Sequence, residues 1–252
     1  MALVDPHSSC KVPSNPNVPI WRYLDLTKFV SLLSERSLYF CRLDRLQDRH
    51  EGAFSRAAIR DRASAIAKRG RIPIEGTSQD KIRATLSKHV TGRRRRTFVN
   101  CWHVNEHESA AMWSTYVRQG DGIAVRSTFA LLRDAFTWTL RPIHLGLVRY
   151  VDHNSEALLE KDDLAPCLWK RKSFAHEREL RAVVQYEPGQ LKGKDALTTG
   201  VCAGVNLQKL IDRIYLSPTC QDAFRRVVAS LLQKYELAVP VQYSDLGSDP
   251  LI

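Results

Sequence analysis

The sequence predicts an α+β fold with a mixed, mainly antiparallel central sheet, flanking helices and a basic helical insertion. Two observations indicate this class. Apolar strand-like runs and amphipathic helices follow one another without strict strand–helix alternation. Thirteen lysines and arginines, against three acids, lie between residues 56 and 96. We expect a flexible arm over 1–19 and a single domain over 20–252, with the insertion at about 53–96.

The first half of the domain combines short strands with helices. Asp25 follows an apolar run and can cap the helix after it, whose apolar residues recur at helical spacing. The insertion contains an Ala/Arg-rich helix and a second helix. The expected elements are strand 20–23, the helix after Asp25, strand 38–43, a loop over 44–52, helices 53–69 and 80–90, and strand 97–104.

The second half continues the same mixture. A good amphipathic helix over 221–235 is the clearest of its elements. The elements expected before it are helix 106–118, strand 123–126, helix 128–136, strand 145–151, a weak helix over 154–163, a strand opening at Glu177, strand 205–206, helix 207–213 and strand 214–216. A last strand, 239–243, is expected after it.

The positive charge is concentrated in the insertion. The whole chain has a net charge of +11, and the stretch from 56 to 96 carries +10 of it. A localised basic block attracts polyanions, of which nucleic acid is the usual one. The alternative is a solvated basic face. The candidate nucleic-acid-binding residues are Lys68, Arg69, Arg71, Arg93, Arg94, Arg95 and Arg96.

Composition argues against several other classes. The six cysteines form no CxxC pair, so neither structural zinc nor a disulfide framework is expected. His103 and His107 lie four apart but lack a third ligand at suitable spacing, and no metal site is expected. No apolar run approaches the roughly 20 residues of a membrane helix, and the N-terminus lacks a signal-peptide pattern. We therefore expect a cytoplasmic protein without a membrane partner.

Two glutamates one residue apart are the main chemical signal. Glu177 and Glu179 precede an apolar, β-branched segment from Leu180 to Tyr186, which favours a strand. Residues two apart on a strand share a face, so Glu177, Glu179 and Arg181 are expected on one side. Two carboxylates at this spacing repel each other unless cations or water offset their charge. The pair indicates a catalytic site; the alternative is a structural set of ion pairs.

Four short stretches with aromatic and charged residues are spread over residues 20–246. They are Trp21-Arg22-Tyr23 with Leu38-Tyr39-Phe40; Asn100-Cys101-Trp102-His103 with Met112-Trp113 and Tyr116; Lys172-Ser173-Phe174 with Glu177 to Arg181; and Ile214 to Pro218. In their order they resemble a large prokaryotic and phage family that is a domain of unknown function. The resemblance implies no established chemistry.

Three of the motifs also resemble, more distantly, those of ADP-ribosyltransferases. They are Arg22 on an early strand, Ser127-Thr128 on a middle strand, and Glu177 with Glu179 opening a later one. The resemblance implies that NAD is the cofactor and that Arg22 holds its phosphates. Ser127 would brace the strand facing the nicotinamide ribose. Glu179 would be the main catalytic carboxylate, stabilising the cation that forms as nicotinamide leaves, and Glu177 would orient the acceptor.

Each of these residues also has a structural interpretation. Phe129 stands where the motif has its third serine, and Ser127-Thr128 is also a typical helix N-cap. Arg22 can stack on a neighbouring tryptophan. Trp113 and Tyr116 are candidate walls of the NAD site, although core packing is the default for aromatic residues.

The sequence thus predicts an ADP-ribosyltransferase-like enzyme, a cytoplasmic effector such as a toxin or phage-defence protein, that uses NAD to modify a nucleic acid or an associated target. One alternative is a metal-dependent nuclease in which Glu177, Glu179 and His176 hold the ion. The other is a non-catalytic nucleic-acid-binding protein. A protein partner such as an antitoxin, and the oligomeric state, are left open.

Overall fold

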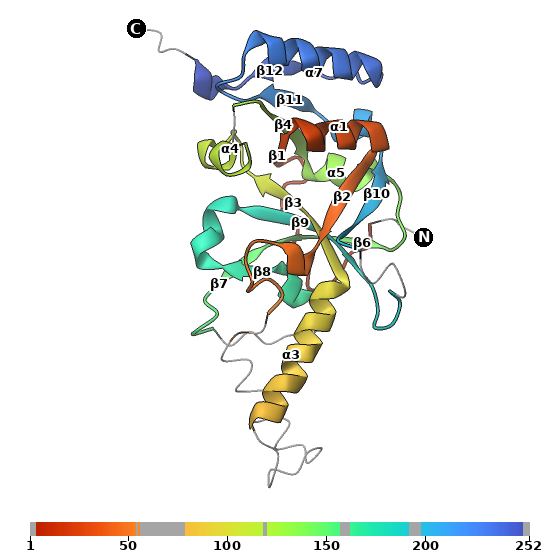
Figure 1. Ribbon diagram of the computed structural model, residues 1–252, viewed down its shortest axis with the longest axis vertical. Helices are drawn as coiled ribbons and strands as arrows, with labels where there is room; N and C mark the ends of the chain where they lie inside the picture. The colour runs from red at the N-terminus through yellow and green to blue at the C-terminus, as the bar shows by residue number, and fades with distance from the viewer. Residues whose placement is uncertain are drawn as a thin grey trace.

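The computed structural model describes residues 4–53, 55, 79–117, 120–156, 162–191 and 198–248, with side chains given except over 79–83. Within them, ten strands form a mixed, mainly antiparallel sheet and two more form a small parallel ribbon. Helices cover the sheet (Figure 1). The α+β prediction is therefore confirmed.

The first half of the chain builds the centre of the sheet. Its elements are β1 (Pro19–Asp25), α1 (Leu26–Glu35), β2 (Ser37–Arg42), the 3-10 turn η1 (Leu43–Arg45), α3 (Gln79–Arg95), β3 (Thr97–Val104), α4 (Ala110–Tyr116), β4 (Gly122–Thr128) and α5 (Phe129–Ala135). The expected helix 53–69 and the loop after it lie almost entirely outside the described residues. Helix α3 runs further than the 80–90 expected, because it continues through Gly92 into the arginines.

The second half adds strands at both edges. Its elements are β5 (Phe136–Trp138), β6 (Ile143–Leu147), β7 (Arg149–Val151), η2 (Ala165–Leu168), β8 (Trp169–Arg171), η3 (Lys172–Glu177), β9 (Glu179–Gln185), β10 (Gly200–Val205), α6 (Leu207–Leu210), β11 (Arg213–Leu216), α7 (Asp222–Lys234), β12 (Val241–Tyr243) and η5 (Asp245–Gly247). The weak helix expected over 154–163 is absent from the described part of that range, where residues 153–155 form a turn.

Polar caps and apolar faces explain the helices. The side chain of Asp25 accepts from the backbone N–H of Lys28 at 2.8 Å, as expected of an N-cap. Helices α1 and α7 bury one apolar face each in the main core, through residues such as Phe29 and Val228. Helix α3 differs, because most of its described side chains are exposed and it projects from the body of the protein (Figure 1).

The sheet order is β12-β11-β4-β1-β3-β2-β10-β5, with β9 pairing the second edge of β3 and β6 pairing β9. Strand β3 is therefore a branch point. Along one edge it pairs with β9 from Thr97 to His103. The other edge is shared, because β2 pairs at Phe98 and Val99 whereas β1 pairs only at His103 and Val104.

The described part of the N-terminal segment is bonded to the domain. Val4 forms a bridge with Ile143, and the carbonyl of Lys11 accepts from Leu147. The expectation of a flexible arm does not account for these bonds. In the described residues, no helix combines the length and apolarity required to cross a membrane.

Candidate active site

A pocket opens where β1 and β2 separate from β3. Residues 100–102 of β3 lie between the two pairing regions and have no strand partner on that edge among the described residues. Side chains bond there instead. Arg22 donates to the carbonyl of Cys101 at 2.9 Å, and Asn100 donates to the carbonyl of Tyr39 at 2.9 Å. Unpaired backbone groups need such partners, so these bonds stabilise the division of the sheet.

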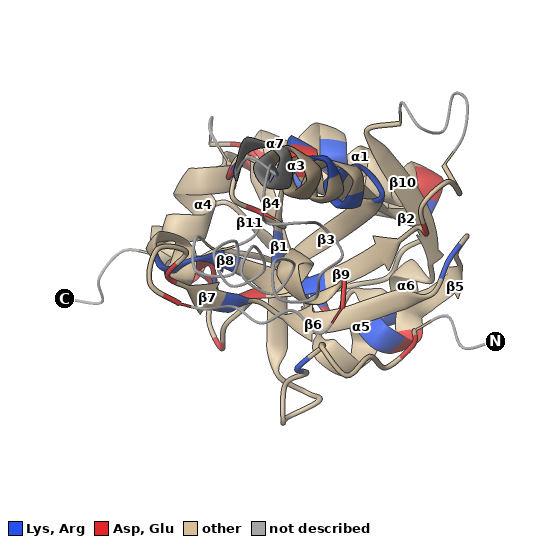
Figure 2. Cartoon of the chain, turned by 90° about the horizontal axis from the view of Figure 1, so that it is seen from below, with Lys and Arg blue, Asp and Glu red and all other residues tan. Residues whose placement is uncertain are grey.

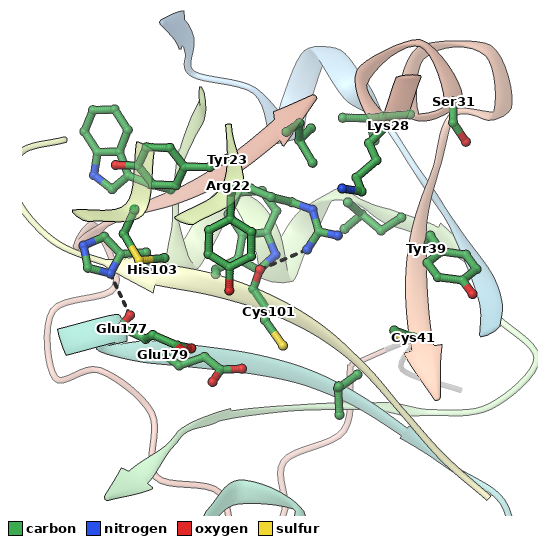
Figure 3. A pocket seen from close by; sticks show the side chains of 18 of the residues that line it. Arg22, Tyr23, Lys28, Ser31, Tyr39, Cys41, Cys101, His103, Glu177 and Glu179 are labelled. Atoms are coloured by element: carbon green, nitrogen blue, oxygen red, sulfur yellow. Dashed lines mark hydrogen bonds between the residues drawn. The ribbon is translucent and has the colours of Figure 1, made fainter. Parts of the chain in front are cut away.

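The pocket is large enough for a cofactor-sized ligand. Its volume is about 590 Å³, within the range of about 300–1,000 Å³ for small-molecule sites. Strands β1, β2 and β3, helix α1 and the start of β9 contribute its lining. In Figure 3, Arg22 and Lys28 extend toward one end of the pocket, and Glu177 and Glu179 lie at the opposite end. The two ends therefore differ in charge.

Arg22 provides the cationic end. It is half-buried on β1, and its guanidinium lies 6.0 Å from the ring centroid of Trp102. Stacking on Trp102 replaces the contact with Trp21 that the sequence suggested; Arg126 lies over Trp21 instead, at 5.8 Å. Within the described residues Arg22 forms no ion pair with a carboxylate. Burial lowers the pKa of Arg22, yet an arginine side chain stays protonated in proteins. A half-buried cation without an anionic partner favours an anionic ligand.

The acidic end is part of a buried cluster of three carboxylates and two cations. Lys170 lies 2.5 Å from Glu177, 3.2 Å from Glu179 and 3.3 Å from Glu51. Arg181 binds both oxygens of Glu179, at 2.7 and 3.0 Å, and also contacts Glu51 at 2.7 Å. All five residues are buried. The cations offset the repulsion between the carboxylates, as the spacing of the pair requires.

Ionisation in this cluster follows from its charges. Burial alone would raise the pKa of Glu179, but Arg181 and Lys170 outweigh it and lower the pKa to about 2. Burial raises the pKa of Glu51 despite the same two cations. The carboxylates in turn raise the pKa of Lys170 against the effect of its burial. Glu179 is therefore a permanent anion at neutral pH.

Glu177 reaches the cluster in a different way from that predicted. It ends the 3-10 helix η3, and β9 begins only at Glu179. Arg178 between them adopts a left-handed conformation with φ 41°, which is uncommon for a residue other than glycine. The expectation that Glu177, Glu179 and Arg181 share one strand face is correct for the last two. The turn at Arg178, rather than strand periodicity, brings Glu177 beside them.

Neighbouring groups fix this turn. His103 Nδ1 lies 2.6 Å from the carbonyl of Glu177, so this nitrogen is the donor. Burial lowers the pKa of His103, which keeps the ring neutral. The hydroxyl of Tyr150 accepts from the backbone N–H of Glu179 at 2.8 Å. The backbone on both sides of Arg178 is thus held from β3 and from β7.

Of the cofactor-binding residues expected from the sequence, Arg22 and Tyr116 line the pocket together with Glu177 and Glu179. Burial, followed by the nearby charge of Glu177, raises the pKa of Tyr116, so its hydroxyl stays protonated. Trp113 lies outside the pocket, packed against Tyr23 in a separate apolar cluster.

Ser127 is also outside the pocket. Its side chain is fully buried, and its hydroxyl donates to the carbonyl of Leu210 at 2.5 Å. This bond directs the hydroxyl toward helix α6, and a cofactor-binding role of Ser127 stays a prediction. Thr128 accepts from the N–H of Leu131 at 3.2 Å, which confirms the N-cap interpretation of this dipeptide.

The four consecutive arginines have different environments. Arg93 is 0% exposed and donates to the carbonyl of Gly52 at 2.6 Å, and Arg96 pairs with Asp163. Arg94 is half-buried, whereas the side chain of Arg95 is 65% exposed. A nucleic-acid contact of Arg93 stays a prediction, and it would require the buried side chain to become accessible. Figure 2 shows blue basic segments on α3. Lys68, Arg69 and Arg71 lie outside the described residues.

A metal between the two glutamates conflicts with Lys170. Its ammonium lies 2.5 Å from Glu177 and 3.2 Å from Glu179, where a bridging divalent ion would need to bind. His176, the third expected ligand, is exposed and does not line the pocket. Across the described ranges, no three His, Cys, Asp or Glu side chains are grouped as a metal site would require. The geometry does not favour the nuclease alternative.

Sequence reasoning singled out neither Glu51 nor Lys170. Glu51 is 1% exposed and lies in the polar loop after η1. No motif or spacing marks it, because its contacts with Lys170 and Arg181 arise only in the folded chain. Lys170 owes its position to β8, which pairs with β7 in parallel.

Comparison with known proteins gives distant structural likenesses. No family model and no curated protein matches the chain. Thermus sp. 2.9 DarT in complex with ADP-ribosylated ssDNA is similar with a TM-score of 0.41 and 10% identity, covering 94% of this chain and 98% of that one. The same DarT in complex with carba-NAD+ gives a TM-score of 0.39 and 12% identity, covering 93% and 98%. Values this low do not define a family.

Proposed function

We propose that the chain is an ADP-ribosyltransferase-like enzyme that uses NAD to modify a nucleic acid or a nucleic-acid-associated target. The observation that carries this proposal is the convergence of Arg22, Glu177 and Glu179 on one pocket. Arg22 is far from the two glutamates in the sequence and need not meet them in the fold. Any joint role for them requires that they do.

The residues present fit NAD. Its phosphates are anionic and suit Arg22, which forms no ion pair with a carboxylate in the described part of the chain. Lys28 adds a second cation at the same end, although its side chain also pairs with Asp25 at 2.7 Å. Tyr39 and Tyr116 provide aromatic surface for the rings of the ligand.

The acidic end suits the chemistry. NAD supplies a glycosidic bond whose cleavage places positive charge on the ribose as nicotinamide leaves. A fixed carboxylate facing that charge stabilises the transition state. Because Lys170 and Arg181 hold the carboxylates before any ligand binds, little reorganisation is needed during the reaction.

We assign the acceptor of the ADP-ribose group from the basic side chains on the protein surface. The exposed Arg95 and Lys88 lie on α3, which projects from the domain (Figure 1). Such a helix can contact the phosphates of a nucleic acid without sequence preference. We therefore assign nucleic acid, or a protein bound to it, as the target.

The test is release of nicotinamide from NAD by the purified protein in the presence of nucleic acid. Arg22→Met removes the charge at similar volume, and we expect KM for NAD to rise at least about tenfold, equivalent to ~1.4 kcal/mol. Arg126→Met is the matched control, because Arg126 also lies over an indole ring but is outside the pocket. No release by the wild-type protein, or equal KM values for both variants, would refute the proposal.

A further inference from the structure

Glu177 and Glu179 differ in how many hydrogen bonds their carboxylate oxygens already accept from the protein. A carboxylate has two oxygens with about four acceptor positions. At Glu179, Oε1 accepts from Arg181 Nε, and Oε2 accepts from Arg181 Nη2 and Lys170 Nζ. Both oxygens of Glu179 are therefore engaged by cations of the protein, through three hydrogen bonds.

Glu177 retains free capacity. Its Oε2 accepts from Lys170 at 2.5 Å, and in the described part of the chain Oε1 has no hydrogen-bond partner. The residue lines the pocket, and its charge reaches Tyr116 there, whose pKa it raises. A carboxylate at a pocket wall with one oxygen not bonded to the described residues is available to a ligand.

We infer that Glu177 is the carboxylate that contacts the substrate, and that Glu179 is a positioning residue that holds Lys170 and Arg181. This rests on the proposed function and departs from what the resemblance to ADP-ribosyltransferases implies, because that resemblance makes Glu179 the main catalytic carboxylate. Glu51 is the third carboxylate of this cluster, because it pairs with the same two cations although it lies much earlier in the sequence. Three carboxylates share two cations in this cluster, and Glu177 is the one with an oxygen left for a ligand in the pocket.

The strained backbone supports this assignment. Arg178 in the left-handed region costs about 1 kcal/mol. That turn, held by His103 on one side and Tyr150 on the other, places the Glu177 carboxylate within reach of Lys170. A strand continuing through residue 177 would not need the turn. Strain of this kind is typical of functional sites, where the surrounding structure maintains it.

Glu177 would act as the general base of the transfer reaction. The bond between ribose C1′ and the nicotinamide nitrogen breaks, and its electron pair leaves with neutral nicotinamide. An oxygen or nitrogen of the acceptor bonds to C1′. The acceptor's proton passes to Oε1 of Glu177, which then releases it to solvent. Glu179 stays ionised throughout, bound to Arg181.

The test compares Glu177→Gln, Glu179→Gln and the double variant Glu179→Gln/Arg181→Met. For each we measure nicotinamide release, the affinity for ADP-ribose by titration calorimetry, and urea unfolding. Glu177→Gln should fold normally, because Lys170 keeps Glu51 and Glu179 as partners. It should bind ADP-ribose within about tenfold of wild type but release nicotinamide at least ~100-fold more slowly, as for loss of a general base.

Glu179→Gln should lose stability, because it leaves the buried Arg181 without its bidentate partner. The double variant removes both members of the pair, so it should recover part of that stability, although Glu51 loses Arg181 as a partner. Glu177→Gln that folds and releases nicotinamide like wild type, or Glu179→Gln as stable as wild type, would overturn the assignment while leaving the proposed function intact. A wild-type protein that neither binds ADP-ribose nor releases nicotinamide would overturn the function itself.

Discussion

Replacing Glu179 by glutamine should destabilise the protein strongly, because it removes one charge from a buried pair. The side chain is 4% exposed, and its partner Arg181 is 0% exposed. Arg181 would keep its contacts with Glu51 and with the carbonyl of Cys167, at 2.7 Å each. It would lose the bidentate contact, whose geometry makes charged hydrogen bonds strong.

The magnitude follows from the pKa. Arg181 and Lys170 lower the pKa of Glu179 from an ordinary 4.5 to about 2. One pKa unit corresponds to ~1.4 kcal/mol, so folding favours the ionised form by about 3 kcal/mol. This agrees with the roughly 3–5 kcal/mol lost when one partner of a buried ion pair is removed. We therefore expect the free energy of unfolding to fall by about 3 kcal/mol at pH 7.

The assay is urea unfolding followed by circular dichroism. The control is Asp134→Asn, which breaks an exposed pair with Arg133 (side chains 49% and 46% exposed). Exposed pairs contribute less than ~1 kcal/mol, so this variant should be close to wild type. A loss of under about 1 kcal/mol in Glu179→Gln, equal to that of the control, would refute the reasoning.

Three further results are expected. A carboxyl group whose pKa is lowered in the folded state stabilises the fold at pH values above its unfolded-state pKa. This stabilisation is lost as pH falls through the folded-state pKa, so the stability difference between wild type and Glu179→Gln should shrink from pH 5 toward pH 2 in urea titrations. A difference independent of pH would contradict this. Ser127→Ala should cost about 1 kcal/mol through its bond to the Leu210 carbonyl but leave nicotinamide release unchanged, and a tenfold loss of release would return Ser127 to the site. Arg95→Gln should lower the salt slope of single-stranded DNA affinity, measured by fluorescence anisotropy, by about 0.7; an unchanged slope would exclude Arg95 from the interface.

Patterns several residues long predicted the fold best. The strand over 97–104 matches β3 at both ends, and the amphipathic helix over 221–235 matches α7 within a residue at each end. The three-residue strands β5 and β8 were missed, because so short a segment shows no periodicity. Most of β10 was missed as well; its sequence GVCAGV is rich in small residues, and the strand forms through its pairing with β2.

The site was only partly predictable for a related reason. The motifs singled out Arg22, Glu177 and Glu179, which do meet in one pocket. They could not reveal that β1 and β2 separate along β3, because the edge over residues 100–102, which pairs with no described strand there, is a tertiary feature. The same applies to Glu51, whose contacts come from segments more than 100 residues away.

Strand periodicity gave the correct neighbours for Glu179 but the wrong local structure for Glu177. The turn at Arg178 depends on bonds from His103 and Tyr150, which are distant in the sequence. The arginines at 93–96 illustrate the same limit, since their composition indicates charge but not which of them is buried.

The most direct test of the account is a crystal structure of the protein with ADP-ribose. The account predicts that the ligand lies between β1, β2 and α1, with a phosphate on the Arg22 guanidinium and the ribose within hydrogen-bond distance of the Glu177 carboxylate. The ligand bound elsewhere, or the pocket empty at saturating ADP-ribose with Arg22 still bonded to Cys101, would contradict it.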